Sequence, residues 1–215
     1  MQNMKKILIP LLCLLVSGMS SSARAEVPPP DVLIQNTVQE VMQIVNADKG
    51  ITSNQKRLHE LVDAKILPHF DFGRMTQLAV GRGWRTATAE QKQSLIAEFR
   101  TMLVRTYTKV FITYPDPKVE VKPVKLGSDD TETTVRTLIR LKSGQSVTID
   151  YEMGKSPTGW RAFDVTVEGV SLVTSYRGSF ADQIQQSGID GLIKALADKN
   201  LAANTAASQK KVQTN

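Results

Sequence analysis

Asp164 comes nearest to catalytic chemistry by residue type and setting. It is the only carboxylate in the largely apolar stretch 160–167, and burial beside aromatic side chains would raise its pKa toward that of a general base. A single carboxylate on a strand is also a common partner for a basic side chain, and Arg161 or Arg136 would supply one. The sequence therefore leaves two roles open for Asp164, a general base or a structural partner.

Other patterns with chemical potential do not assemble into a site. His59 and His69 are ten residues apart, too far for the i, i+4 pair that binds zinc on a helix. Gly81-Arg82-Gly83 lies between two predicted helices, whereas a phosphate-binding loop follows a strand. Ser171 lacks the second glycine of a nucleophile elbow and is expected at the start of a helix. We therefore expect no metal and no cofactor.

The first 25 residues have the order of a secretory signal peptide. A basic start precedes the apolar run 7–16, and small residues lead to Ala23-Arg24-Ala25, after which we expect cleavage. The only cysteine, Cys13, lies in this leader, and the large leucines before it do not match a lipoprotein signal. The mature protein is thus expected in the periplasm, without a disulfide and stabilised by a packed core.

Length and charge predict one domain. The 215 residues less the 25 of the leader leave 190, and we expect a single domain over 26–200 followed by a disordered polar tail at 201–215. The leader carries Lys5, Lys6 and Arg24 and no acidic residue, so the formal net charge falls from +6 to +3. This small excess argues against a nucleic-acid partner and is compatible with an anionic membrane surface.

Apolar residues recur at helical spacing before residue 115. We expect a helix from Asp31, as N-cap, to Asp48, a second one from the capping box 52–55 to Pro68, and a short one near 75–80. The clearest capping box, Thr88-Ala89-Glu90-Gln91, opens a long amphipathic helix that ends near residue 114.

The spacing of apolar residues then changes to alternation, which predicts strands at 119–124, 133–141, 145–153 and 160–167. Short connections make these four strands an antiparallel meander with one apolar side. Helical spacing returns after Gly169 and again after Gly188. The predicted fold class is α+β, a four-stranded antiparallel sheet with helices gathered on its apolar face.

Periodicity does not distinguish a filled core from a hollow one. The long helix, the inner side of the sheet and the residues after Gly169 supply apolar and aromatic surface in quantity. From these residues alone, the simplest prediction is that they fill one another as an ordinary core.

The chain resembles the MlaC family, also called the toluene-tolerance family, of periplasmic phospholipid-binding proteins. The likeness extends over nearly all of the mature chain. It is carried by Phe70-Asp71-Phe72-Gly73-Arg74-Met75, Gly81-Arg82-Gly83-Trp84-Arg85, Thr88-Ala89-Glu90-Gln91, Phe99-Arg100, Thr106-Tyr107, Asp150-Tyr151, Trp160-Arg161-Ala162-Phe163-Asp164-Val165, Val167-Glu168-Gly169-Val170-Ser171-Leu172, Tyr176-Arg177 and Gly188-Ile189-Asp190-Gly191-Leu192-Ile193.

This resemblance implies helices wrapped around the sheet, with an apolar cavity for acyl chains and a headgroup that faces solvent. It implies a monomeric carrier that shuttles phospholipid between an outer-membrane lipoprotein complex and an inner-membrane ABC transporter complex, maintains outer-membrane lipid asymmetry and catalyses no reaction.

The apolar faces give a hypothetical cavity lining, and three arginines are candidates for the headgroup region. Arg74, Arg82 and Arg177 are the three arginines. The lining comprises Met75, Leu78, Phe99, Leu103, Tyr107, Val135, Ile139, Val147, Ile149, Tyr151, Phe163, Val165, Val167, Val170 and Val173.

Two alternatives remain open. One is a small-molecule enzyme on a cone-shaped α+β fold, with Asp164 as general base in a closed pocket. The other is a binding protein for a polar solute, which is disfavoured because that class usually needs two lobes and a longer chain.

Overall fold

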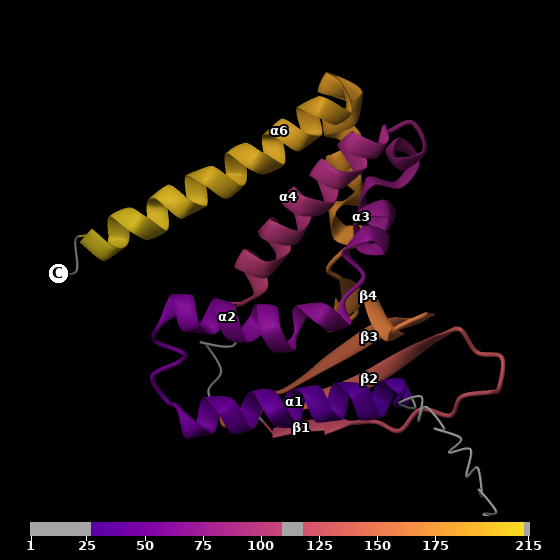
Figure 1. Cartoon of the computed structure of the whole chain (residues 1–215), viewed down its shortest axis with the longest axis vertical. Helices are drawn as coiled ribbons and strands as arrows, with labels where there is room; N and C mark the ends of the chain where they lie inside the picture. The colour runs from indigo at the N-terminus through magenta and orange to yellow at the C-terminus, as the bar shows by residue number, and fades with distance from the viewer. Residues whose placement is uncertain (1–26, 109–117, 213–215) are drawn as a thin grey trace, which may run out of the picture.

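The computed structural model describes residues 27–108 and 118–212 (Figure 1). The predicted leader with its cleavage site and the predicted end of the long helix lie outside the described residues. Its elements are, in chain order, α1 (Pro30–Ala47), α2 (Gln55–Lys65), η1 (Leu67–His69), α3 (Phe72–Val80), η2 (Gly81–Arg85), α4 (Ala89–Thr108), β1 (Lys118–Val121), β2 (Glu132–Arg140), β3 (Ser146–Ser156), β4 (Gly159–Val167), β5 (Val170–Ser171), η3 (Thr174–Tyr176) and α6 (Arg177–Val212).

The capping box before α4 forms as predicted. The backbone N–H of Gln91 donates to Thr88 Oγ1 at 3.2 Å, and the backbone N–H of Thr88 donates to Gln91 Oε1 at 3.0 Å. Before α2 the cap is instead a single residue, Asn54, whose side chain accepts from the N–H of Arg57. Both helices therefore begin where polar side chains satisfy their first free amides.

Asp31 is not the N-cap of α1. The helix starts at Pro30, where the ring's missing N–H costs nothing, and Pro29 takes the cap position. The Asp31 carboxylate instead accepts the backbone N–H of Val124 at 3.1 Å, which ties the start of α1 to the chain between β1 and β2.

The sheet has five antiparallel strands in the order β1-β2-β3-β4-β5, one more than predicted. The added strand, β5, occupies the segment expected to begin a helix. Glu168 and Gly169 both have positive φ, 49° and 81°, the backbone that a two-residue hairpin turn requires, and Val167 pairs with Val170 across it. Ser171 is consequently a strand residue.

Only part of the helical layer covers the sheet (Figure 1). α1 packs along one face, where Ile34 joins Val135, Met153, Trp160 and Ala162 in one apolar cluster. α3, α4 and α6 pack on one another in a second cluster, and α2 joins α1 in a small third one. The prediction that the helices gather on the apolar face of the sheet therefore holds for α1 but not for the α3–α4–α6 group.

α6 bends at Gly188, where φ is 71° and ψ is −176°, and its second half returns along α4. Asn200 secures this return, because its amide donates to the backbone carbonyl of Glu98 at 3.0 Å and to that residue's carboxylate at 2.7 Å. The helix runs on to Val212 through the expected disordered tail, since an alanine-rich sequence favours helix. No helix in the described ranges is long and apolar enough to cross a bilayer.

Candidate functional site

Asp164 has a structural role in this fold. Its side chain is 7% exposed, and its carboxylate accepts the backbone N–H of Val165 at 2.7 Å, the N–H of Val173 at 3.2 Å and the hydroxyl of Ser171. Neither arginine proposed as its partner pairs with it, because Arg136 binds Asp150 and Arg161 binds Thr158. These bonds hold the turn from β4 through β5 into η3.

The six helix and loop residues of the predicted lining fill one another. Phe99 is fully buried, and its ring packs edge-on against Tyr176 and Phe180, each with centroids 5.3 Å away. Tyr107 packs against the same cluster, and burial with a hydrogen bond to Tyr176 raises its pKa to about 12. The other members of this cluster from the predicted lining are Met75, Leu78, Leu103 and Val173.

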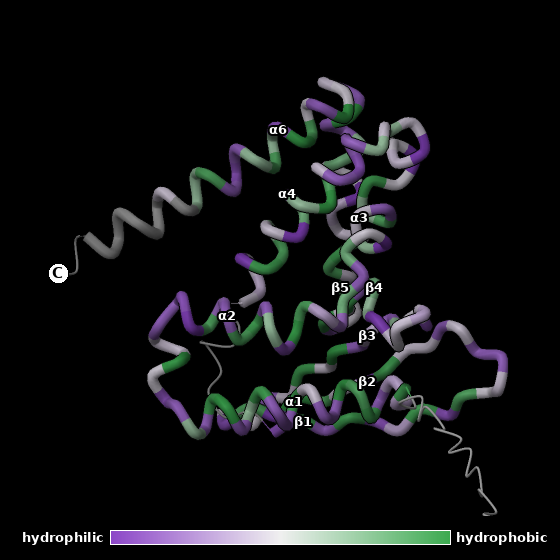
Figure 2. Tube along the Cα trace, viewed as in Figure 1, coloured by the Kyte–Doolittle hydropathy of each residue, from purple (hydrophilic) through white to green (hydrophobic). Residues whose placement is uncertain are grey.

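The sheet residues of the predicted lining form rows on one face. Paired residues on adjacent strands share a face, so the register aligns Val135, Tyr151 and Val165 in one row, Ile149 and Val167 in the next, and Ile139 with Val147 in a third. Thr137 shares the second row, and its hydroxyl donates to the carbonyl of Ile149. The face is therefore largely apolar, and the colour of the tube in Figure 2 changes along the strands because successive residues belong to opposite faces.

Burial differs along this face. Val135 is fully buried under α1, and Val165 is also buried. Ile139, Val147, Ile149 and Val167 are only half-buried and belong to none of the packed clusters of the described residues. The described helices thus leave the β2–β3 end of the apolar face partly uncovered.

Two predicted lining residues lie elsewhere. A register shift at Glu152/Met153 leaves Phe163 out of the paired rows, and the Arg74 guanidinium lies 3.4 Å from its ring centroid. Val170 follows the hairpin turn and is 60% exposed. Alternation alone could not reveal the bulge or the short fifth strand.

Two of the three predicted headgroup arginines lie together, and the third lies elsewhere. Arg74 forms an ion pair with Glu132 at 2.7 Å. Arg177 donates twice to the carbonyl of Leu78 at the end of α3. Arg82 and Arg177 share a pocket of about 390 Å³ between η2 and α6, with apolar walls that include Ile184. Their role at a headgroup stays a prediction.

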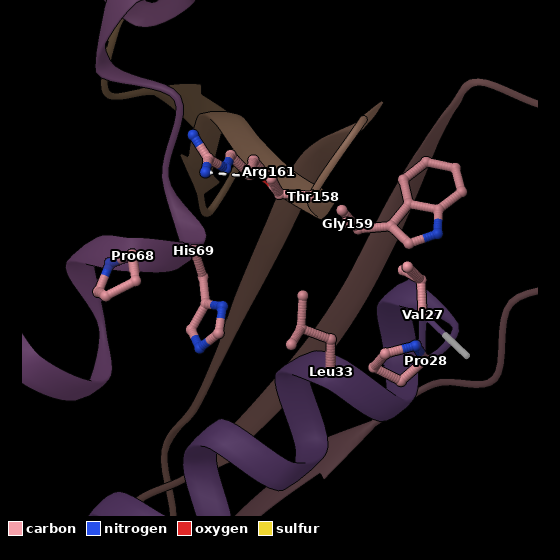
Figure 3. A pocket seen from close by; sticks show the side chains of 9 residues that line it. Val27, Pro28, Leu33, Pro68, His69, Thr158, Gly159 and Arg161 are labelled. Carbon is pink, nitrogen blue, oxygen red and sulfur yellow. Dashed lines mark hydrogen bonds between the residues drawn. The ribbon is translucent and has the colours of Figure 1, made fainter. Parts of the chain in front are cut away.

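A pocket of about 410 Å³ lies between the start of α1, η1 and the β3–β4 hairpin (Figure 3). Figure 3 shows His69 pointing from η1 toward Leu33 of α1, and Arg161 extending along the hairpin to Thr158. The pocket is lined by Val27, Pro28, Leu33, Pro68, His69, Thr158, Gly159, Trp160 and Arg161. It therefore combines apolar walls with two nitrogen-rich side chains.

Burial and charges of both signs act on His69 in this pocket. Burial lowers the pKa of His69, the carboxylate of Glu40 opposes that effect, and the charge of Arg161 lowers the pKa further. Glu40 is itself paired with Lys65. Arg161 has a neutral hydroxyl as its bonded partner, and no carboxylate in the described ranges forms an ion pair with it.

Sequence reasoning missed this pocket because His69 and Arg161 come from distant segments. Phe70 forms a parallel bridge with Ala162, and the N–H of Asp71 donates to the carbonyl of Ala162 at 2.8 Å. His69 and Arg161 precede the two bridged residues, and nothing in their spacing predicts this pairing. Elsewhere in the described residues, no three His, Cys, Asp or Glu side chains gather as a metal site would need.

The chain is similar to known proteins over most of its length. The family model described as MlaC protein matches residues 35–198. The intermembrane phospholipid transport system binding protein MlaC of Haemophilus influenzae is 21% identical over 168 residues, which cover 76% of this chain and 78% of the relative. Toluene tolerance protein ttg2D of Pseudomonas putida is 25% identical over 163 residues, 75% of either chain.

A solved structure agrees with the fold. The phospholipid-binding protein from Ralstonia solanacearum, in complex with a phospholipid, superposes with a TM-score of 0.74 at 33% sequence identity. The match covers 81% of this chain and 98% of that one.

Proposed function

Because this chain belongs to the MlaC family, we propose that it is a periplasmic phospholipid carrier. It shuttles lipid between an outer-membrane lipoprotein complex and an inner-membrane ABC transporter complex, works as a monomer, and so maintains the lipid asymmetry of the outer membrane. It catalyses no reaction, which is consistent with the structural bonds that occupy Asp164.

The half-covered apolar face of the sheet carries this proposal. Ile139, Val147, Ile149 and Val167 form neighbouring rows of large side chains that no described helix buries fully. A protein of this size normally covers such a face with its own core. Acyl chains of a bound lipid supply the missing layer.

The energy of lipid transfer explains why a carrier needs this surface. Exposing an acyl chain to water costs about 0.8 kcal/mol for each CH₂ group, so two chains of about fifteen carbons cost on the order of 20 kcal/mol. The carrier must cover both tails during transit. Few polar contacts are needed, because the tails have no hydrogen-bonding groups.

Native mass spectrometry tests the proposal directly. We expect the mature protein, purified from the periplasm without detergent, to carry about one phospholipid per molecule, which organic extraction then identifies. A protein that is lipid-free and also takes up no lipid from vesicles would contradict the proposal.

A pair of neighbouring substitutions tests the location of the tails. Val147→Asp places a charge on the half-buried apolar face and should abolish lipid uptake. Ser146→Asp is the matched control, because Ser146 is exposed on the opposite face and pairs with Arg140 across the strands. Equal uptake by both variants, with the fold intact by circular dichroism, would remove Val147 from the lining.

A further inference from the structure

We propose that Tyr151 closes one end of the half-covered apolar face and so limits the length of the acyl chains that this protein carries. This inference rests on the proposed function and names a specificity-determining residue for the same ligand. The property that Tyr151 selects is the length of the tail, whatever headgroup the lipid has.

A change in burial between two neighbouring rows of the sheet marks the closed end. Tyr151 pairs with Val135 on one side and Val165 on the other, and these two valines are 0% and 8% exposed. Ile149 and Val167, in the next row, are only half-buried. A tail that lies along the half-covered rows therefore meets packed protein at the row of Tyr151. Since the headgroup must face solvent, the terminal methyl of the tail points toward this row.

The packing of α1 explains why the cover of the sheet stops here. Ile34 and Val38 of this helix belong to the cluster on the sheet that Tyr151 also joins. About one turn further along, Val41 packs instead with α2 in the small third cluster. The apolar contacts of α1 thus pass from the sheet to α2 after Val38, and the rows beyond Tyr151 lose this cover.

The ring of Tyr151 lies across the path of a tail. Its hydroxyl is hydrogen-bonded to the side chain of Thr137, which belongs to the next row and is 1% exposed. The hydroxyl of Thr137 also donates to the carbonyl of Ile149 at 3.0 Å. The ring therefore leans from its own row toward the half-covered rows. Tyr151 is half-buried, so part of its ring is accessible to a ligand.

The length of the half-covered face matches an ordinary acyl chain. Val147 and Tyr151 are four residues apart on β3, a span of about 14 Å. The hydrocarbon of one bilayer leaflet is about 15 Å thick, half of a core of about 30 Å. A tail of ordinary length thus fills the rows from Val147 to Tyr151. A longer tail meets the ring and keeps part of its hydrocarbon in water.

Competition between two tail lengths measures this limit. Vesicles contain equal amounts of dimyristoyl and distearoyl phosphatidylglycerol, and mass spectrometry gives the ratio in which the full mature protein takes them up. Dividing the ratio of a variant by that of wild type removes the different tendencies of the two lipids to leave the vesicle. We expect Tyr151→Ala to raise the share of the distearoyl lipid about fourfold or more, because each further CH₂ group that the protein covers contributes about that factor to affinity.

Two control variants separate the size of the ring from other effects. Tyr151→Phe keeps the ring and removes the hydroxyl, so it should keep the wild-type ratio. Tyr176→Ala makes the same truncation in the α3–α4–α6 cluster, where Tyr176 packs against Phe99 and Phe180, and it should also keep the ratio. If Tyr151→Ala does not fold, Tyr151→Leu should shift the ratio in the same direction by a smaller factor.

The outcomes separate this inference from the proposed function. If wild-type protein takes up neither lipid, the carrier function fails and this inference fails with it. If wild type takes up both and Tyr151→Ala keeps the wild-type ratio, with its fold intact by circular dichroism, only the limit at Tyr151 is wrong. An equal shift in Tyr151→Phe would mean that the lipid senses the hydroxyl, and a shift in Tyr176→Ala would place the ends of the tails in the α3–α4–α6 cluster. Either result would overturn the role of the ring.

Discussion

Replacement of Phe99 distinguishes a packed core from a lipid-filled one. The ring is 0% exposed and contacts the rings of Tyr176 and Phe180. A side chain that lined an empty cavity would have few protein neighbours. We therefore expect Phe99→Ala to destabilise the lipid-free protein strongly and to leave the intrinsic affinity for lipid nearly unchanged.

The magnitude follows from burial. Removing a fully buried phenylalanine costs about 3–5 kcal/mol, which includes roughly 0.5–1.5 kcal/mol for each lost aromatic pair. Ile149→Ala is the comparison, because its half-buried side chain contributes about 1–2 kcal/mol to folding and would contact lipid. We thus expect Phe99→Ala to lose more stability than Ile149→Ala, and Ile149→Ala to lose more lipid uptake than Phe99→Ala.

Urea unfolding of delipidated protein, followed by circular dichroism, measures the first quantity, and vesicle uptake measures the second. Phe99→Leu is available if the alanine variant does not fold, with the same expected ranking at a smaller magnitude. A loss of stability below about 1 kcal/mol for Phe99→Ala, together with a large loss of uptake, would refute the packed-core reasoning.

Three further predictions follow from single contacts. Asp164→Asn should cost about 1–3 kcal/mol and speed amide exchange at Val173, with lipid uptake retained. Thr88→Ala should cost about 1 kcal/mol in urea unfolding, because it removes the cap of α4. Tyr107 has a folded pKa of about 12, above its ordinary value of 10.0, so the stability that it contributes should be complete below pH 10 and decline from pH 10 to 12. Tyr107→Phe should remove this decline from thermal melts recorded over that range.

Local sequence features predicted most elements of the fold. The capping box joins Thr88 and Gln91, and the alternation along β2 and β3 concerns residues that are close in sequence. Both features involve only residues one to four positions apart, so they could be predicted without knowing the rest of the fold. Asp31 failed as a cap because a backbone amide 93 residues away, at Val124, takes its carboxylate. The hairpin at Glu168 and Gly169 was missed because its strand is two residues long and too short for alternation to register.

The candidate site could not be predicted in this way, because it depends on which element covers each apolar face. No local sequence pattern specifies that element. Phe99 and Ile149 have the same apolar character and the same predicted role, yet one is enclosed by α6 and the other is half open. The proximity of His69 to Arg161 arises from a bridge between segments about ninety residues apart, which no motif encodes.

The strength of the contacts at each interface indicates which element yields when lipid enters. α4 and α6 share a large buried cluster, whereas α2 meets α1 through a small cluster and exposed ion pairs, such as Lys65 with Glu40, that contribute at most about 1 kcal/mol each. Displacing α2 therefore costs much less than opening the α4–α6 cluster. Amide exchange should slow in α2 on lipid loading and stay constant in α4, and the reverse pattern would mean that the tails enter between α4 and α6.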